Sequence, residues 1–253
     1  MRLFLDIGNT AMKWRLYSPG KPRMQGGQAH RRDWASLVDE LAQRCGGHVR
    51  ELWVASVAGR EGDQLLEKEL LRALGAQPRF YYSPAAGAGV VNAYADPARL
   101  GVDRWLAMVE VWHRTGAAVI VDCGSALTLD AVDGNGQHLG GYIVPGLAML
   151  RGSLFQGTAQ VRVTDSAPAT LGLGCSTSAG VENGVLRMSV AFVTDVVVEL
   201  RKTLSDTCPV FITGGDAAVL QPHLGFATQA EPDLVLDGLE RVVVSGAGDG
   251  TQG

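Results

Sequence analysis

The sequence predicts an α/β protein made of two similar halves. Apolar stretches of strand length alternate with amphipathic stretches of helical length along the 253 residues, which is typical of layered α/β folds. The order strand, strand, strand, helix, strand, helix occurs twice, and the halves meet near Thr115 and Gly116. Each half opens with an apolar strand followed by Asp-x-Gly and a small polar residue, at Asp6 and again at Asp122. Because solenoid repeats are about 20 to 50 residues long, a repeat of this length indicates a duplicated domain.

The first half contains one full set of these elements. Asp33 is a helix cap followed by apolar residues at helical spacing, and Gly46 and Gly47 end that helix. A second amphipathic run is stopped by Gly75. In chain order we expect strands at 2–7, 12–17 and 24–30, a helix from Asp33, a strand at 51–57, a helix at 63–74 and a strand at 79–82.

The second half starts over with an apolar strand that ends at Asp122. The Asp-Gly-Asn-Gly sequence at 133–136 is a strong hairpin signal. A helix with Val102 in its first turn precedes the second half, at the end of the first half. In chain order we expect strands at 117–122, 126–132 and 140–144, helices at 148–155 and 178–204, and a strand at 209–212.

Composition excludes several classes of protein. The net charge is −4 without a basic stripe, which argues against a nucleic-acid footprint. The four cysteines are scattered without a Cys-x-x-Cys pair. We therefore expect no zinc site, and we expect the protein to be in a reducing compartment. The N-terminus is too short and too acidic for a signal peptide, and no apolar run approaches the ~18 residues of a membrane span. We expect a cytoplasmic protein.

The first acidic turn has the composition of a phosphate-binding loop. Gly8 allows the backbone to approach a ligand closely, and the amides of Gly8, Asn9 and Thr10, with the Thr10 hydroxyl and Lys13, would cradle a polyphosphate. Asp6 would hold a hydrated magnesium ion beside it. A plain β-hairpin whose Asp and Asn cap their own turn fits this copy equally well.

The second copy, at Asp122 to Ser125, favours a nucleotide site, since two such turns facing one cleft would form it. The pair Gly214 and Gly215 follows a strand and would let an adenosine lie near the backbone, although an ordinary strand-to-helix turn has the same sequence.

The start of the helix at Val102 carries the second candidate constellation. The helix dipole alone accounts for Asp103, because acids are favoured in a first turn, but it disfavours a cation such as Arg104. The functional interpretation gives Asp103 the proton of a substrate hydroxyl and Arg104 the charge of a substrate or phosphate. Residues 172–180 lack the Gly-Lys-Ser/Thr ending of a Walker A loop, and Ser176 or Thr177 has the composition of a helix cap. The five histidines are dispersed, and none is assigned a role.

Four motifs, in this order and spacing, resemble one known family: DIGNTAMK, LGVDRW, VDCGSALTLD and FITGGD. The chain resembles type III pantothenate kinase, of the acetate and sugar kinase/Hsp70/actin superfamily, from Met1 to about Val244. The resemblance implies two ribonuclease H-like (actin-like ATPase) domains, each with a central mixed sheet flanked by helices. They would span 1–115 and 116–248, followed by a flexible tail at 249–253.

The resemblance also implies roles for individual residues. Asp103 would be the general base, Asp122 would bind a monovalent cation (K⁺ or NH₄⁺), and Asp6 would bind Mg²⁺ through water. Ser125 stands where many members have threonine, and its hydroxyl keeps the contact with ATP. The ATP-binding residues would be Asp6, Ile7, Gly8, Asn9, Thr10, Ala11, Met12, Lys13, Ser125, Gly214 and Gly215. The pantothenate-binding residues would be Tyr94, Gly101, Val102, Asp103, Arg104 and Thr177.

The implied activity is ATP-dependent phosphorylation of pantothenate, the first step of coenzyme A synthesis. The implied assembly is a homodimer with its sites near the subunit interface, and the helix at 178–204 is the candidate packing face, although its valine stripe fits an ordinary core equally well. Two alternatives stay open. One is a superfamily kinase for another small hydroxy acid or sugar, and the other is a nucleotide-binding regulator like the Bvg accessory factors.

Overall fold

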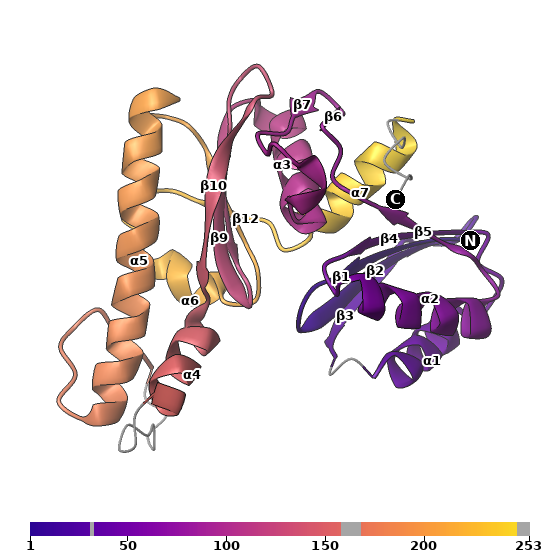
Figure 1. The fold of residues 1–253 in the computed structure, drawn as a ribbon, viewed down its shortest axis with the longest axis horizontal. Coiled ribbons are helices and arrows are strands. Elements are labelled where there is room, and N and C mark those ends of the chain that lie inside the picture. The colour runs from indigo at the N-terminus through magenta and orange to yellow at the C-terminus, as the bar shows by residue number, and fades with distance from the viewer. Residues whose placement is uncertain (31–32, 158–167, 247–253) are drawn as a thin grey trace. The chain divides into compact units, whose positions relative to one another are not determined.

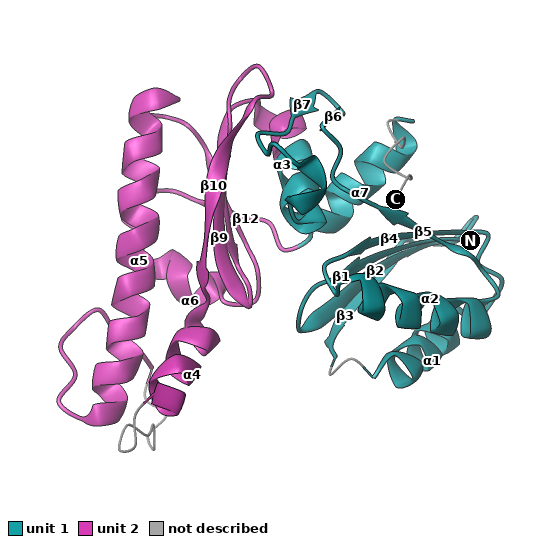
Figure 2. Ribbon diagram, in the orientation of Figure 1, with its two compact units in different colours: residues 1–110, 233–253 teal, residues 111–232 magenta. Residues whose placement is uncertain are grey.

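The computed structural model describes residues 1–30, 33–157 and 168–246 (Figure 1). The tail expected at 249–253 lies outside the described residues. The chain forms two compact units (Figure 2). Unit 1 contains Met1–Glu110 and Asp233–Gly253, and unit 2 contains Val111–Pro232.

Unit 1 is built on a five-stranded mixed sheet in the order β3-β2-β1-β4-β5. Strands β1, β2 and β3 pair antiparallel, whereas β1, β4 and β5 are parallel. Helices α1 and α2 pack their apolar faces on one side of the sheet, against alternate residues of β1 such as Leu3 and Leu5, and α7 covers the other side (Figure 1). The bounds are β1 Arg2–Ile7, β2 Ala11–Tyr17, β3 Met24–Ala29, α1 Trp34–Cys45, β4 Glu51–Ser56, α2 Arg60–Leu74, β5 Pro78–Tyr81 and α7 Leu234–Val244.

A short irregular segment follows β5 and leads into the helix that carries the second candidate constellation. It contains the small hairpin of β6 (Ala86–Gly87) and β7 (Val90–Val91) and the 3₁₀ turn η1 (Pro97–Arg99). Helix α3 (Val102–Thr115) then begins in unit 1 and ends in unit 2.

Unit 2 repeats the sheet of unit 1, in the order β10-β9-β8-β11-β12. The pairings β10–β9 and β9–β8 are antiparallel, and β8, β11 and β12 are parallel, as in the first sheet. The valine-rich stripe of α5 packs on Val119 and Val121 of β8, so it is core of this unit. The bounds are β8 Ala118–Cys123, β9 Ala126–Val132, β10 His138–Pro145, α4 Leu147–Gly157, α5 Thr177–Thr203, β11 Val210–Thr213, α6 Ala217–Leu220, η2 Gln221–His223 and β12 Gln229–Ala230.

The α/β class and the duplication are confirmed, while the predicted ranges of the halves differ from those of the two units. The two sheets share strand order and direction, which the repeated element order predicts. The expected domains 1–115 and 116–248 differ from the observed units, because the chain returns to unit 1 at Asp233. Helix α7, which was not predicted, packs on β1, β2 and β4 and on α3. Helix α2 begins at Arg60, earlier than the expected residue 63.

Within the described ranges, none of the helices combines the length and the apolar character that a membrane crossing requires.

Candidate active site

The first acidic turn lies at the carboxyl end of β1 and is closed as a hairpin. Asp6 lies opposite Lys13 in the antiparallel register of β1 and β2. The Gly8 amide donates to the Ala11 carbonyl at 2.9 Å, and the two residues between them form an exposed tip. The Gly8 amide therefore has an acceptor inside the turn, and its contact with a ligand stays a prediction. The Asn9 amide finds no acceptor within residues 1–30, 33–157 and 168–246.

A histidine that sequence reasoning left without a role holds this turn from the side. His30 directly follows β3, and its amide donates to the Thr10 carbonyl at 2.8 Å. Its Nε2 lies 3.0 Å from the Gly8 carbonyl oxygen, and its ring lies 4.8 Å from that of Trp34. The side chain is buried. These contacts of His30 could not be predicted from the sequence, because they depend on the pairing of β2 with β3.

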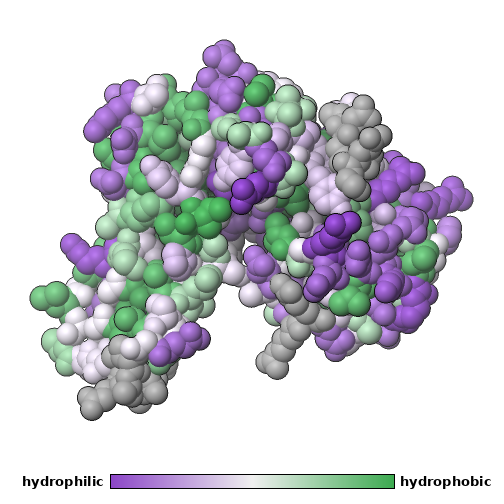
Figure 3. Space-filling view, in the orientation of Figure 1, coloured by the Kyte–Doolittle hydropathy of each residue, from purple (hydrophilic) through white to green (hydrophobic). Residues whose placement is uncertain are grey.

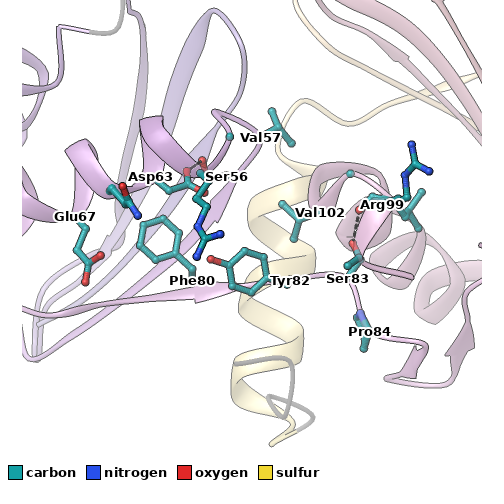
Figure 4. Close-up of a pocket in the computed structure, with 16 residues that line it drawn as sticks. Ser56, Val57, Asp63, Glu67, Phe80, Tyr82, Ser83, Pro84, Arg99 and Val102 are labelled. Atoms are coloured by element: carbon teal, nitrogen blue, oxygen red, sulfur yellow. Dashed lines mark hydrogen bonds between the residues drawn. The ribbon is translucent and has the colours of Figure 1, made fainter. Parts of the chain in front are cut away.

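A cavity of about 910 Å³ opens in unit 1 where β4 and β5 end (Figure 4). Ligands of parallel α/β sheets bind outside the carboxyl ends of the strands, and this cavity has that location. One wall carries Val57, whose amide donates to the Ile7 carbonyl at 3.0 Å, and so borders the base of the acidic turn. The opposite wall is formed by residues 98–102, which include Gly101 and Val102. The cavity is therefore lined by one predicted site segment, at Gly101 and Val102, and by Val57, a hydrogen-bonded neighbour of the acidic turn.

A half-buried carboxylate faces this cavity from α2. The Ser56 hydroxyl donates to Asp63 at 2.5 Å, and the Ala58 amide donates to the same hydroxyl at 3.2 Å (Figure 4). Burial raises the pKa of Asp63, and the hydrogen bond from Ser56 opposes that rise. Tyr82 stands between Asp63 and Val102 in Figure 4. Burial, followed by the nearby Asp63 carboxylate, raises the pKa of the Tyr82 phenol.

The start of α3 brings four of the predicted pantothenate-binding residues together. Oδ1 of Asp103 accepts from the Arg104 amide at 2.8 Å and lies above Gly101, where a Cβ would be 2.5 Å from it. The Arg104 guanidinium is 6% exposed and donates to the Tyr94 hydroxyl at 2.9 Å. Its charge lies 5.8 Å from the centre of the Tyr94 ring, within cation–π range. The backbone before the helix is held by Ser83, whose hydroxyl donates to the Leu100 carbonyl at 2.9 Å.

The second acidic turn lies at the equivalent strand end in unit 2. Asp122 pairs in register with Thr213 of β11, so the Gly214–Gly215 pair follows next to it. Gly214 has φ +90°, and a Cβ there would lie 2.5 Å from Oδ1 of Asp122 and collide with the Cys123 carbonyl. Glycine is therefore required at this contact. The arrangement brings Asp122 and the glycine pair to one edge of the sheet.

Cys123 follows Asp122 at this edge and is also near the Asp216 carboxylate, and it is not a nucleophile. Burial, with the carboxylates of Asp122 and Asp216, raises the pKa of its thiol to about 12. At neutral pH the sulfur is protonated, and only the thiolate reacts. Its carbonyl instead accepts the Asp216 amide at 2.9 Å and fixes the Gly-Gly turn.

Thr177 is the first residue of α5 and is exposed. The cap of that helix is Ser176, whose hydroxyl accepts from the Ala179 amide at 3.1 Å. Of the two hydroxyls considered as caps, Ser176 has that role, and the Thr177 hydroxyl is not needed for it.

A model of the family described as Type III pantothenate kinase matches residues 2–199. The chain belongs to the type III pantothenate kinase family. A type III pantothenate kinase from Alcanivorax borkumensis is 54% identical over 242 residues, which cover 96% of this chain and 98% of that protein. One from Nitrosococcus oceani is 38% identical over 252 residues, covering 96% and 93%.

Solved structures of low identity share the fold of this pantothenate kinase. A 2-dehydro-3-deoxygalactonokinase protein from Sinorhizobium meliloti aligns with a TM-score of 0.61 at 11% identity, over 97% of this chain and 96% of that one. A Baf family transcriptional activator from Campylobacter jejuni aligns with a TM-score of 0.57 at 18% identity, over 96% and 98%. The duplicated actin-like kinase fold is thereby confirmed.

The predicted site residues of the kinase fall into two groups, one in each unit. Unit 1 holds the acidic turn at 6–13 and the cluster of Tyr94 with residues 101–104, and unit 2 holds Asp122, Ser125, the glycine pair and Thr177. That the two groups face one cleft stays a prediction. In the described part of the chain, no group of three or more His, Cys, Asp or Glu side chains is arranged to hold a metal ion.

Proposed function

We propose that the chain carries out the reaction of its family, ATP-dependent phosphorylation of pantothenate to 4'-phosphopantothenate, with Asp103 as the general base. The observation that carries the residue assignment is the cluster at the start of α3. A carboxylate lies over Gly101, next to the buried Arg104 and its half-buried partner Tyr94, and the backbone of that segment forms a wall of the unit 1 cavity. Substrate and nucleotide are both metabolites of the cytoplasm, where we place the reaction.

The donor side of the reaction is assigned to the acidic turn of unit 1. Phosphoryl transfer depends on positioning and charge neutralisation more than on covalent chemistry. The exposed tip at 9–10 offers backbone donors to the phosphates, and Lys13 supplies a positive charge one strand away from Asp6. The half-buried carboxylate of Asp6 at the strand end suits Mg²⁺ held through water, since this ion keeps several waters and binds few protein carboxylates.

The acceptor side is assigned to the cluster at the start of α3. Asp103 orients the primary hydroxyl of pantothenate and takes its proton as the new O–P bond forms. The planar fork of N–H donors on a guanidinium matches the geometry of a carboxylate, so Arg104, which also donates to Tyr94, has the chemistry to bind the pantothenate carboxylate. Its burial strengthens that attraction because water is excluded.

The unit 2 residues are assigned to the nucleotide and to a monovalent cation. The half-buried Asp122 carboxylate at the end of β8 suits K⁺ or NH₄⁺, and the Ser125 hydroxyl is a contact for ATP. Gly214 and Gly215 leave room for the adenosine, because neither carries a side chain. Thr177 is assigned to pantothenate, and its exposed position outside the cap of α5 leaves its hydroxyl available for that contact.

We assign the exposed apolar face of unit 2 to a homodimer interface. Large apolar side chains at least 39% exposed gather on β10, α4 and α5, and the space-filling view has green areas over this unit (Figure 3). Patches of this kind mark protein–protein contacts in soluble proteins. The residues are Tyr142, Ile143, Met149, Leu154, Met188 and Val198.

The test is release of ADP in a coupled assay with ATP and pantothenate, with and without K⁺. We expect turnover that needs both pantothenate and the cation. The Asp103→Asn variant should keep the fold and lose about 10²–10⁴ in kcat, the usual worth of a positioned base. If folded Asp103→Asn turns over at the wild-type rate, Asp103 is not the base. If the wild type releases ADP with another hydroxy acid or sugar instead, the alternative kinase is correct, and binding of nucleotide without turnover would indicate the regulator.

A further inference from the structure

His30 makes two contacts that hold both ends of the exposed tip of the acidic turn. Its backbone amide donates to the Thr10 carbonyl at 2.8 Å. Its imidazole Nε2 lies 3.0 Å from the Gly8 carbonyl oxygen. Because a carbonyl oxygen only accepts hydrogen bonds, Nε2 carries a proton and donates it.

The contact with the Gly8 carbonyl sets the direction of the next amide. In a trans peptide the C=O and the following N–H point to opposite sides, and the described residues contain no cis peptide bond. With the Gly8 carbonyl turned toward His30, the Asn9 N–H points away from the imidazole. This is the amide at the tip that has no acceptor in the described part of the protein.

The imidazole is itself held by rigid neighbours. Its side chain is buried, and its ring lies 4.8 Å from the ring of Trp34, the first residue of α1. The Asp33 carboxylate caps that helix by accepting the Ser36 amide at 3.3 Å. Gly8, by contrast, has no side chain to restrict its backbone. The fixed imidazole therefore restrains a peptide group that would otherwise rotate easily.

Unit 2 contains the corresponding hairpin, one residue shorter, without such a side chain. Gly146 follows β10 as His30 follows β3, and its amide donates to the Ser125 carbonyl at 3.1 Å, as that of His30 does to Thr10. A Cβ at Gly146 would lie 2.6 Å from the Ser125 carbonyl oxygen and collide with that of Gly124. The fold thus closes this hairpin with glycine in one unit and adds an imidazole in the other.

We propose that His30 is a positioning residue for nucleotide binding: through the Gly8 carbonyl it aims the Asn9 amide at the polyphosphate of a nucleoside di- or triphosphate. This inference rests on the proposed role of the turn at 6–13 as the phosphate loop. It assigns the imidazole no contact with substrate and no part in proton transfer.

Two variants at this position distinguish the role of the hydrogen-bond donor from that of the aromatic ring. His30→Phe keeps an aromatic ring beside Trp34 but cannot donate, whereas His30→Gln keeps an N–H donor at similar reach and loses the ring. The backbone amide that donates to Thr10 is present in both variants. His223→Phe, at a half-buried position in η2 of unit 2, is the matched control for exchanging a histidine.

The measurements are ADP affinity by calorimetry without pantothenate, the two KM values, and Tm. We expect His30→Phe to weaken ADP binding and raise the KM for ATP by about twofold to tenfold, the worth of one neutral hydrogen bond. The KM for pantothenate should not change, and His30→Gln should recover most of the ADP affinity. Unchanged ADP affinity in His30→Phe would overturn the proposal. Equal losses of ADP affinity in both variants, in proportion to their loss of Tm, would also overturn it, because a purely structural role of His30 gives that result.

The calorimetry also separates this inference from the proposed reaction. If the wild type binds ADP but does not phosphorylate pantothenate, the acceptor assignment fails, while a weaker ADP complex of His30→Phe still supports the role of His30. If the wild type does not bind ADP, the role of His30 fails together with the phosphate loop.

Discussion

The Gly101→Ala substitution tests the position of the Asp103 carboxylate without removing it. A Cβ at residue 101 would lie 2.5 Å from Oδ1 of Asp103, whereas ordinary contact begins at 3.4 Å. The carboxylate must therefore move by about 0.9 Å, the difference 3.4 − 2.5. Alanine is tolerated by the backbone here, because Gly101 is not among the glycines with positive φ. The perturbation is therefore confined to the acid and its neighbours.

The expected cost follows from this displacement. A misplacement of about 1 Å at a reacting group can lower the rate by about 10²-fold, or about 2.7 kcal/mol in the activation free energy. We expect kcat to fall by about tenfold to a hundredfold. The KM for ATP should stay within about twofold of the wild-type value, because the nucleotide is assigned to other residues.

The assay is steady-state ADP release with saturating ATP and pantothenate, with Tm measured on the same samples. Gly134→Ala is the matched control, since a Cβ there has no neighbour within 4 Å and the residue lies in the hairpin between β9 and β10. A folded Gly101→Ala variant with wild-type kcat would refute the reasoning, because the carboxylate could then move without consequence for the chemistry.

Three further outcomes are expected. Asp122→Ala should raise the K⁺ concentration needed for half-maximal turnover, and an unchanged K⁺ dependence would remove Asp122 from the cation site. Arg15 is 1% exposed and contacts two α7 carboxylates at 2.7 Å, so Arg15→Ala should lower the free energy of unfolding by about 3 kcal/mol in urea titrations. Arg72→Ala, at an exposed pair, should change it little. Since burial raises the folded-state pKa of Asp63, the folded protein binds its proton more tightly, and stability should fall as pH rises from about 4 through that pKa. Asp63→Asn should flatten this slope in urea titrations between pH 4 and 7, and an unchanged slope would show that Asp63 is not its source.

Local patterns were sufficient to predict most helices and all strands except the two-residue strands β6, β7 and β12. The apolar run of β1 and the turn glycines at 46 and 75 are properties of adjacent residues, and these elements agree with prediction to within a few residues. Helix α7 has no comparable signal, because Gly238 interrupts its apolar pattern and weakens helix propensity. The structure gives the reason for that glycine. A Cβ at Gly238 would collide with the Leu106 carbonyl of α3, so the close crossing of the two helices requires it.

The site was predictable where its residues are neighbours in sequence. Gly101, Asp103 and Arg104 share one helix start, and their arrangement follows from the geometry of a first turn. The contact of His30 with Gly8 and that of Asp63 with Ser56 were not predictable in this way. The first depends on strand pairing, and the second depends on where α2 begins, since a helix starting at Arg60 places Asp63 next to the end of β4.

A difference of one residue between the duplicated turns accounts for their different proposed roles. In unit 1 the Gly8 amide reaches the carbonyl of Ala11, with two residues between them, whereas in unit 2 the Gly124 amide reaches that of Ala126, with only Ser125 between. The longer turn has an additional peptide group at its tip, and the donors needed for a polyphosphate are backbone amides. The shorter turn is more tightly closed and presents a carboxylate and one hydroxyl, which suits a single cation and one phosphate oxygen. A longer tip is also easier to distort, and unit 1 has a histidine at the position where unit 2 has glycine. The restraining side chain, His30, is therefore present in unit 1, the unit in which the direction of a backbone amide is proposed to matter for nucleotide binding.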